Sequence, residues 1–171
     1  MQASIVESSM RSNPRVALLT PGPHHEDYFS HAYLARYLGY LLVEGNDLRT
    51  VGDLLYLKTL EGLKQVDVVV RCIEGHSADP LELDPAGFGG PVGLLDVVRR
   101  TPGLIVNSIG AAVVQNRGLG AYLPSVCRSL LGEDLLLSDT PRRWLGAADA
   151  AGRDGLGDLD QLIVRKAQEG M

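Results

Sequence analysis

Apolar and polar positions alternate along the chain between strand-like and helix-like patterns. An apolar run of strand length, RVALLT, occupies 15–20 and is ended by a Pro-Gly-Pro turn. The spacing over 27–38 is that of an amphipathic helix, and Gly39 is placed to end it. YLLVEG at 40–45 then predicts a second strand.

The same alternation continues along the rest of the chain. The β-branched run VDVVVRCI at 66–73 predicts a parallel strand buried on both faces, and Gly52-Asp53 inside 51–58 predicts a hairpin or an edge strand. The other predicted elements are helices over 92–100 and 119–133, the second interrupted near Pro124, a strand over 103–110, a helical or mixed segment over 140–161 and a strand over 162–166. Strands that alternate with helices predict an α/β fold, with a Rossmann-like parallel or mixed sheet and helices on both faces.

Size, charge and cysteine content narrow the class of protein. A chain of 171 residues with 45% hydrophobic residues has enough apolar sequence for one sizeable core, and 1–13 is predicted to be a disordered N-terminal segment. The net charge of −5 argues against nucleic acid as a partner. No leader-like start and no apolar run of about 18 residues occur, which favours a cytoplasmic protein without membrane contact. Cys72 and Cys127 lie in apolar segments and are predicted to be buried, with neither a disulfide nor a metal-binding pattern.

The turn after the first strand, TPGPHHE at 20–26, is the first candidate site, because ligands of parallel sheets bind beyond the carboxyl ends of the strands. Its candidate substrate-binding residues are Thr20, Gly22, His24 and Glu26. Two interpretations are open: a turn whose backbone N–H groups bind an anion ahead of a helix, or a βα corner with a structural role only. No dinucleotide fingerprint and no P-loop sequence occur in the chain.

Histidines and acids beside this turn allow more than one role. Adjacent His24 and His25 cannot point the same way from extended backbone, and no third ligand is spaced near them, so a metal site is not predicted. His31 falls on the apolar side of the predicted helix, where it is either a core histidine or a group that meets substrate or responds to pH. Glu44 and Asp47, after the second strand, are either turn formers or ligands for a hydroxyl or an amine.

Charged and amide side chains also follow the later strands. Arg71 stands in a strand otherwise built of valine, so its charge needs a partner, and Glu74 and Asp79 are the nearest carboxylates in sequence. An arginine in this position suits sheet architecture as well as the binding of a substrate carboxylate. Three further candidates come after the next strand, namely Asn107, Asn116 and Arg117. No nucleophilic triad is indicated, and the catalytic residues stay unassigned.

Five segments, taken in order, resemble the central part of the circularly permuted type 2 ATP-grasp proteins. They are RVALLTPGPHHEDYFSHAYLARYLGYLLVEGNDL, YLKTLEGLKQVDVVVRCIEG, DPLELDPAGFGGPVGLLDVVR, LIVNSIGAAVVQNRGLGAYLPSVCRSLLGE and RRWLG. The similarity covers 14–166. Five linked segments in the same order are a far more specific signal than any one of them.

The resemblance implies an ATP-dependent carboxylate–amine ligase, related in architecture to glutathione and glutathionylspermidine synthetases, that acts through an acyl phosphate. ATP and Mg²⁺ are the implied cofactors of the full-length family, and the implied partner is a small-molecule or peptide substrate. In this scheme 14–140 would be the Rossmann-like pre-ATP-grasp domain on the substrate side, and 141–171 a helical connection with the first strand of a truncated ATP-grasp domain. Lys166, at the end of LIVRK, would be the lysine that contacts the nucleotide.

Departures from the family pattern and the length of the chain shape these expectations. Ser30 stands where family sequences often have Glu, and Gln115-Asn116-Arg117 stands where many have Asp-Asp-Lys. A Rossmann-like unit leaves too few of 171 residues for the two subdomains that close over a nucleotide, so we expect a fragment that is inactive alone and binds neither ATP nor Mg²⁺ tightly. The rest of an ATP-grasp protein, or a split partner, would complete it, and an unpaired strand at 162–166 favours self-association. The alternative is a non-catalytic Rossmann-like module that binds a ligand or a protein.

Overall fold

The computed structural model describes residues 11, 13–87, 89–137, 140–145, 163 and 165. The chain divides into two compact units, residues 1–111 and 112–171, and each unit is described by itself. This division falls inside the stretch 14–140 that the sequence predicts as one domain. Of the predicted disordered segment 1–13, most lies outside the described residues, while Arg11 lies 3.4 Å from the carboxylate of Asp67.

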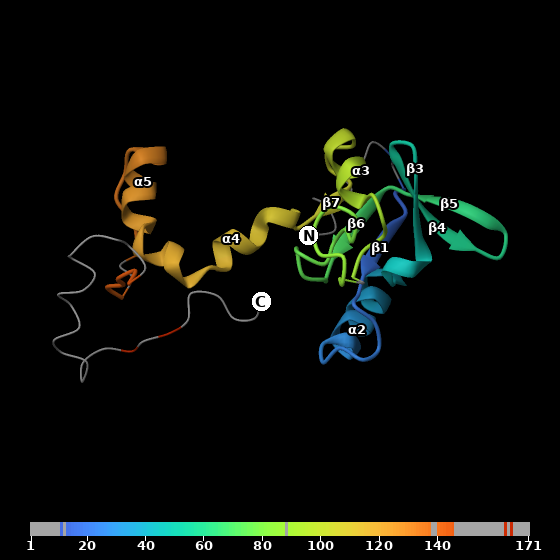
Figure 1. The fold of residues 1–171 in the computed structure, drawn as a ribbon, viewed down its shortest axis with the longest axis horizontal. Helices are drawn as coiled ribbons and strands as arrows, with labels where there is room; N and C mark the ends of the chain where they lie inside the picture. The colour runs from blue at the N-terminus through green and yellow to red at the C-terminus, as the bar shows by residue number, and fades with distance from the viewer. Residues whose placement is uncertain are drawn as a thin grey trace. The chain divides into compact units, whose positions relative to one another are not determined.

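The first unit is built around a four-stranded parallel sheet with the strand order β2-β1-β6-β7 (Figure 1). Its strands are β1 (Val16–Leu19), β2 (Leu41–Val43), β6 (Val68–Arg71) and β7 (Ile105–Val106). Ala17 of β1 pairs with Leu41 on one side and with Val69 on the other. The predicted α/β fold with a parallel sheet is confirmed, although β7 has two residues where the sequence predicts a strand over 103–110.

A three-stranded antiparallel sheet forms next to it in the same unit. It joins β3 (Leu48–Val51), β4 (Leu54–Thr59) and β5 (Gly62–Val66) in sequence order. The hairpin predicted around Gly52-Asp53 is confirmed, since β3 and β4 pair antiparallel on either side of it. The apolar pattern does not indicate β5, so the observed sheet has one strand more than the sequence predicts.

The single strand predicted over 66–73 is wrong, because two different strands share this apolar run. Val66 pairs with Leu55 in the antiparallel sheet, whereas β6 belongs to the parallel sheet. Asp67 lies between them, and its carboxylate accepts a hydrogen bond of 2.8 Å from the backbone N–H of Arg15. The corner at Asp67 therefore ties the start of β6 to the start of β1.

Both faces of the parallel sheet are covered, as the continuous apolar strands predict. Val16 and Leu18 face a cluster formed with α2 (Tyr28–Leu38), whose buried residue is Ala35. Their neighbours Ala17 and Leu19 face the opposite cluster, which α3 (Leu94–Arg100) and the antiparallel sheet complete. Figure 1 shows α2 and α3 on opposite sides of the strands. The predicted helix over 27–38 is thus confirmed, and Gly39 ends it in the left-handed conformation with φ 72°.

The remaining elements are short. The first unit also contains the 3-10 turns η1 (Gly45–Asp47) and η2 (Ile109–Ala111), and the second unit contains α4 (Ala112–Gln115), η3 (Arg117–Ala121) and α5 (Leu123–Leu131). The helical segment predicted over 119–133 is observed as η3 and α5 with Tyr122 between them, so its predicted interruption near Pro124 is confirmed. Pro124 itself lies in the first turn of α5, where a missing N–H is tolerated. Of the predicted segment 140–161, residues 140–145 form neither helix nor strand and the rest lies outside the described residues, as does most of the predicted strand 162–166.

The two cysteines are less buried than the sequence predicts. Cys72 follows β6 and Cys127 lies in α5, and both are half-buried. Burial raises the pKa of the Cys72 thiol, although the charge of Arg71 opposes this shift. Cys72 is therefore held as a thiol and is a poor nucleophile.

Candidate functional site

The carboxyl ends of the parallel strands form the candidate site, because they lie at one edge of the sheet. Thr20 follows β1, Glu44 follows β2, Arg71 ends β6 and Asn107 follows β7. We call this edge of the first unit the carboxyl rim. The structure brings the predicted residues together in two groups, one around Thr20 and one around Arg71.

The first group joins a strand end to helix α2. Thr20 is 1% exposed, and its Oγ1 lies 2.9 Å from Nδ1 of His31. The same Oγ1 accepts a hydrogen bond of 3.5 Å from the backbone N–H of Gly22. The hydroxyl has one hydrogen and two lone pairs, so the contact with Nδ1 of His31 forms with either tautomer of the ring while Gly22 N–H is also accepted. Of the two roles considered for His31, a satisfied structural histidine fits these contacts.

The turn at 20–26 is a βα corner. Gly22 has φ 105°, and a Cβ on it would come within 3.2 Å of the Glu44 carboxylate. The N–H of Gly22 bonds to Thr20, and those of His25 and Tyr28 bond to carbonyls of the turn itself. An anion would meet an acidic side chain and N–H groups that are already engaged, so the anion-binding interpretation loses its support.

The other residues of the turn are open to solvent. His24 and Glu26 are exposed and take no hydrogen bond or ion pair from the described residues. His25 stacks on His31 with ring centroids 6.2 Å apart, and its Nδ1 accepts a hydrogen bond of 3.2 Å from the N–H of Asp27. No group of three or more His, Cys, Asp or Glu among the described residues could hold a metal ion.

The half-buried position of His31 predicts a pH dependence of stability. Burial lowers the pKa of His31 below 6.5; the carboxylate of Asp27 opposes this shift and His25 adds to it. Below pH 6.5 the unfolded chain binds a proton at this position more readily than the folded one, so the free energy of unfolding should fall as pH drops through 6.5 and level off below the folded pKa. We expect urea denaturation at pH 7.5 and 5.5 to show a smaller difference for His31→Gln than for the unchanged chain. His76→Gln, at an exposed histidine, is the control, and equal losses in both variants would contradict this role of His31.

The second group surrounds Arg71, whose guanidinium bonds to backbone carbonyls. Nε donates to the carbonyl of Asn107 at 3.1 Å, Nη2 to that of Ser108 at 3.2 Å, and Nη1 to that of Ile73. Neither Glu74 nor Asp79 is its partner, which corrects the expectation drawn from their nearness in sequence. Asn107 has φ 62° and is the only non-glycine among the described residues with a positive φ. The arginine thus ties the ends of β6 and β7 together while its charge meets no carboxylate within the described residues.

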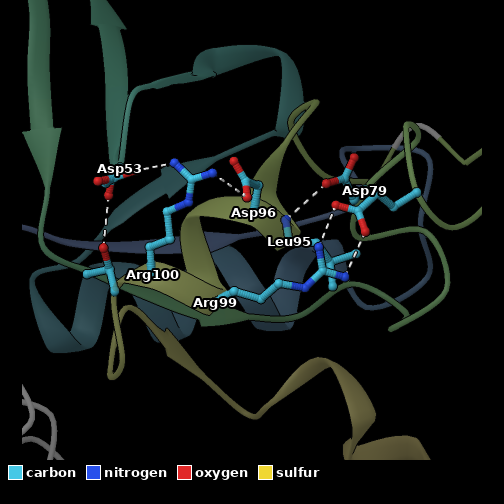
Figure 2. A network of polar contacts seen from close by, with 8 residues as sticks. Asp53, Asp79, Leu95, Asp96, Arg99 and Arg100 are labelled. Atoms are coloured by element: carbon cyan, nitrogen blue, oxygen red, sulfur yellow. Dashed lines mark hydrogen bonds and ion pairs between the residues drawn. The ribbon is translucent and has the colours of Figure 1, made fainter.

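The carboxylate of Asp79 is not available to Arg71, because it has other partners. Sequence reasoning missed this role of Asp79. Its side chain is fully buried and accepts hydrogen bonds from the N–H groups of Leu81 at 2.9 Å, Gly93 at 3.1 Å and Leu95 at 2.9 Å. Figure 2 shows the contact with Leu95. Gly93 and Leu95 begin α3, so the carboxylate both caps this helix and closes the loop after β6.

Three predicted residues belong to the second unit or lie outside the described residues. Asn116 caps η3, since its Oδ1 accepts from the N–H of Gly118 at 2.8 Å. Arg117 begins η3, and both residues belong to the second unit, so their meeting with the carboxyl rim stays a prediction. Lys166 lies outside the described residues.

Within the part of the chain that is described, no helix is long and apolar enough to span a membrane.

Comparison with known proteins defines the family. The family model described as circularly permuted ATP-grasp type 2 matches residues 1–171, and the chain belongs to this family. The resemblance seen in the five sequence segments is thereby confirmed. ATP-grasp proteins generally use ATP and Mg²⁺.

The relatives are longer than this chain. Uncharacterized protein Rv2567 of Mycobacterium tuberculosis is 37% identical over 158 residues, which are 92% of this chain and 18% of that protein. Uncharacterized protein Rv2411c of the same species is 36% identical over 159 residues, 92% of this chain and 28% of its own length. Uncharacterized protein sll0335 of Synechocystis is 34% identical over 156 residues, 91% of this chain and 32% of its own length. The chain thus spans between 18% and 32% of the length of these relatives.

Proposed function

We propose that this chain is the substrate-side segment of an ATP-dependent ligase that joins a carboxylate to an amine. The observation that supports this most is the carboxyl rim: in a member of an ATP-grasp family, Thr20, Arg71 and Asn107 lie where parallel α/β sheets bind ligands. A cation on one part of this edge and the exposed carboxylate of Glu44 on another suit substrates that carry both kinds of charge.

The proposed reaction has two steps. A carboxylate oxygen of the substrate attacks the γ-phosphorus of ATP; a new O–P bond forms, the bond from this phosphorus to the bridging oxygen breaks, and ADP leaves. The nitrogen of the amine then attacks the acyl carbon, the C–N bond forms, the bond from carbon to the phosphate oxygen breaks, and the amine proton passes to solvent. Carboxylate, amine and ATP thus give amide, ADP and phosphate. The part of the carboxyl rim is to bind and orient the substrate.

Nucleotide and metal binding are assigned to another part of the protein. The described residues offer no group of side chains for a metal ion, and the N–H groups of the Gly22 turn are engaged, so we derive no step through Mg²⁺ here. In this proposal the rest of a longer polypeptide, or a separate chain, supplies these groups, and the 171-residue chain alone is inactive. We place the reaction in the cytoplasm, where ATP is abundant.

Trapping of the acyl phosphate tests the proposal. Hydroxylamine attacks acyl phosphates in place of the amine and gives hydroxamates. We expect the complete product of the gene, supplied with MgATP, hydroxylamine and a panel of amino acids, dicarboxylates and peptides, to form a hydroxamate and release ADP in equal amounts. The 171-residue chain should form none and should show no heat of MgATP binding in calorimetry. Tight MgATP binding by the chain alone would refute the division of roles, and the absence of any hydroxamate would favour a binding module.

A further inference from the structure

The charge of Arg71 is held in place but is not neutralised. All three of its bonding partners are backbone carbonyls, and no carboxylate among the described residues lies within 4.0 Å of it. Two other arginines in the same unit are paired: Arg99 meets both oxygens of Glu82, at 2.8 and 2.7 Å, and Arg100 meets Asp53 and Asp96. Removing a guanidinium from water without a counterion is unfavourable, and a bound anion would supply the missing charge.

We infer that Arg71 binds a carboxylate of the substrate at the carboxyl rim, between the ends of β6 and β7. A guanidinium has five N–H groups, and three of them bond to the carbonyls of Ile73, Asn107 and Ser108. One N–H is left on each of Nη1 and Nη2. A carboxylate has one charge and two oxygens, and it pairs with two such N–H groups in the bidentate arrangement.

The surroundings of Arg71 fix its orientation for this role. Nε and Nη2 donate to two consecutive carbonyls after β7, and Asn107 provides the first of them while held at φ 62°. Non-glycine residues rarely adopt the left-handed conformation, and those that do concentrate at functional sites. Asparagine tolerates this conformation better than most residues. The side chain of Asn107 is exposed at the carboxyl rim and is available to a ligand.

A carboxylate fits this position better than a phosphate. A phosphate group carries up to two charges and is usually met by several cations or by a row of free backbone N–H groups. Here one guanidinium stands among carbonyl oxygens, and its two remaining N–H groups match a planar ligand with a single charge.

The geometry also narrows the class of substrate, and this step rests on the proposed function. A carboxylate whose two oxygens both pair with a guanidinium is a poor nucleophile, because its electron density is held by the N–H groups. The carboxylate that attacks ATP must be a different one. The group on Arg71 is therefore a carboxylate that is not consumed, so the substrate is an amino acid, a dicarboxylic acid or a peptide with a free terminal carboxylate.

Titration of the 171-residue chain followed by NMR tests the site. We expect the Arg71 Nε–H signal to shift saturably with sodium succinate or L-glutamate, with half-saturation at about 10 mM, whereas sodium chloride at equal ionic strength leaves it in place. The Arg99 signal is the internal control, since Glu82 already occupies its guanidinium. Arg71→Lys keeps the charge but loses the paired N–H groups, so we expect it to weaken succinate binding at least about tenfold, while Arg99→Lys binds as before.

Each outcome decides the inference. Phosphate binding tighter than succinate, or equal shifts with every salt, would overturn a carboxylate site, and so would an unshifted Arg71 signal in the unchanged chain. The unchanged chain gives this answer even if Arg71→Lys fails to fold. A saturable shift in a protein that forms no hydroxamate would leave the carboxylate site standing and refute the ligase, so the two failures are distinguishable.

Discussion

Replacing Asp79 with alanine is expected to lower the free energy of unfolding of the first unit by about 4 kcal/mol. The fully buried carboxylate accepts three backbone N–H groups, those of Leu81, Gly93 and Leu95, as Figure 2 shows in part. Hydrogen bonds to a charged acceptor are worth more than neutral ones, and alanine leaves their donors without a partner in a partly buried loop. Urea denaturation followed by the amide NMR signals of β1 and β6 reports this loss for the first unit alone.

Asp84→Ala is the matched control for Asp79. Asp84 accepts one N–H, that of Ala86 at 2.9 Å, in a more exposed turn of the same loop, so its loss should cost no more than about 1 kcal/mol. Asp79→Asn keeps one acceptor oxygen and turns an amide hydrogen toward a donor, so an intermediate loss is expected. Equal effects of Asp79→Ala and Asp84→Ala would show that the loop does not depend on the buried carboxylate.

The core of the first unit was predictable because its signals are local. A β-branched run or a helical spacing is complete within about ten residues, so β1, α2, β2 and the hairpin follow from the sequence alone. The run at 66–73 misled for the same reason. Its apolar pattern continues through the corner at Asp67, and only pairing with β4 on one side and β1 on the other shows that two strands meet there.

The site was predictable in its location but not in its contacts. The rule that ligands bind beyond parallel strands selects Thr20, Arg71 and Asn107 without knowledge of any distance. The partner of Arg71 could not be chosen in this way. The N–H groups that Asp79 accepts lie 2, 14 and 16 residues along the chain, so no local pattern shows that this carboxylate is already engaged.

Gly90→Ala is expected to destabilise the first unit by about 3 kcal/mol, because backbone occupies the space that a side chain would need. A Cβ at this position would lie 2.7 Å from the carbonyl carbon of Ala78 and closer still to its oxygen. Ala78 is fully buried, and the N–H of Gly90 donates to the carbonyl of Ser77 at 3.0 Å. Neither of these two loop segments can therefore move away from the other without losing packing and a hydrogen bond. Gly110→Ala, where nothing lies within 4 Å of the added carbon, should change stability by less than about 0.5 kcal/mol in the same urea experiment.

The tight contact at Gly90 matters for function because it joins two parts of the carboxyl rim. Gly45, next to Glu44 at the end of β2, would place a Cβ 2.9 Å from the backbone of Gly89 and Gly90. The loop that follows Arg71 is therefore packed backbone to backbone against the end of β2. We expect Gly90→Ala to broaden the Arg71 Nε–H signal and to weaken succinate binding under conditions where Gly110→Ala leaves both unchanged. If Gly90→Ala were destabilised but bound succinate normally, Arg71 would owe its orientation to the carbonyls after β7 alone and not to this packed loop.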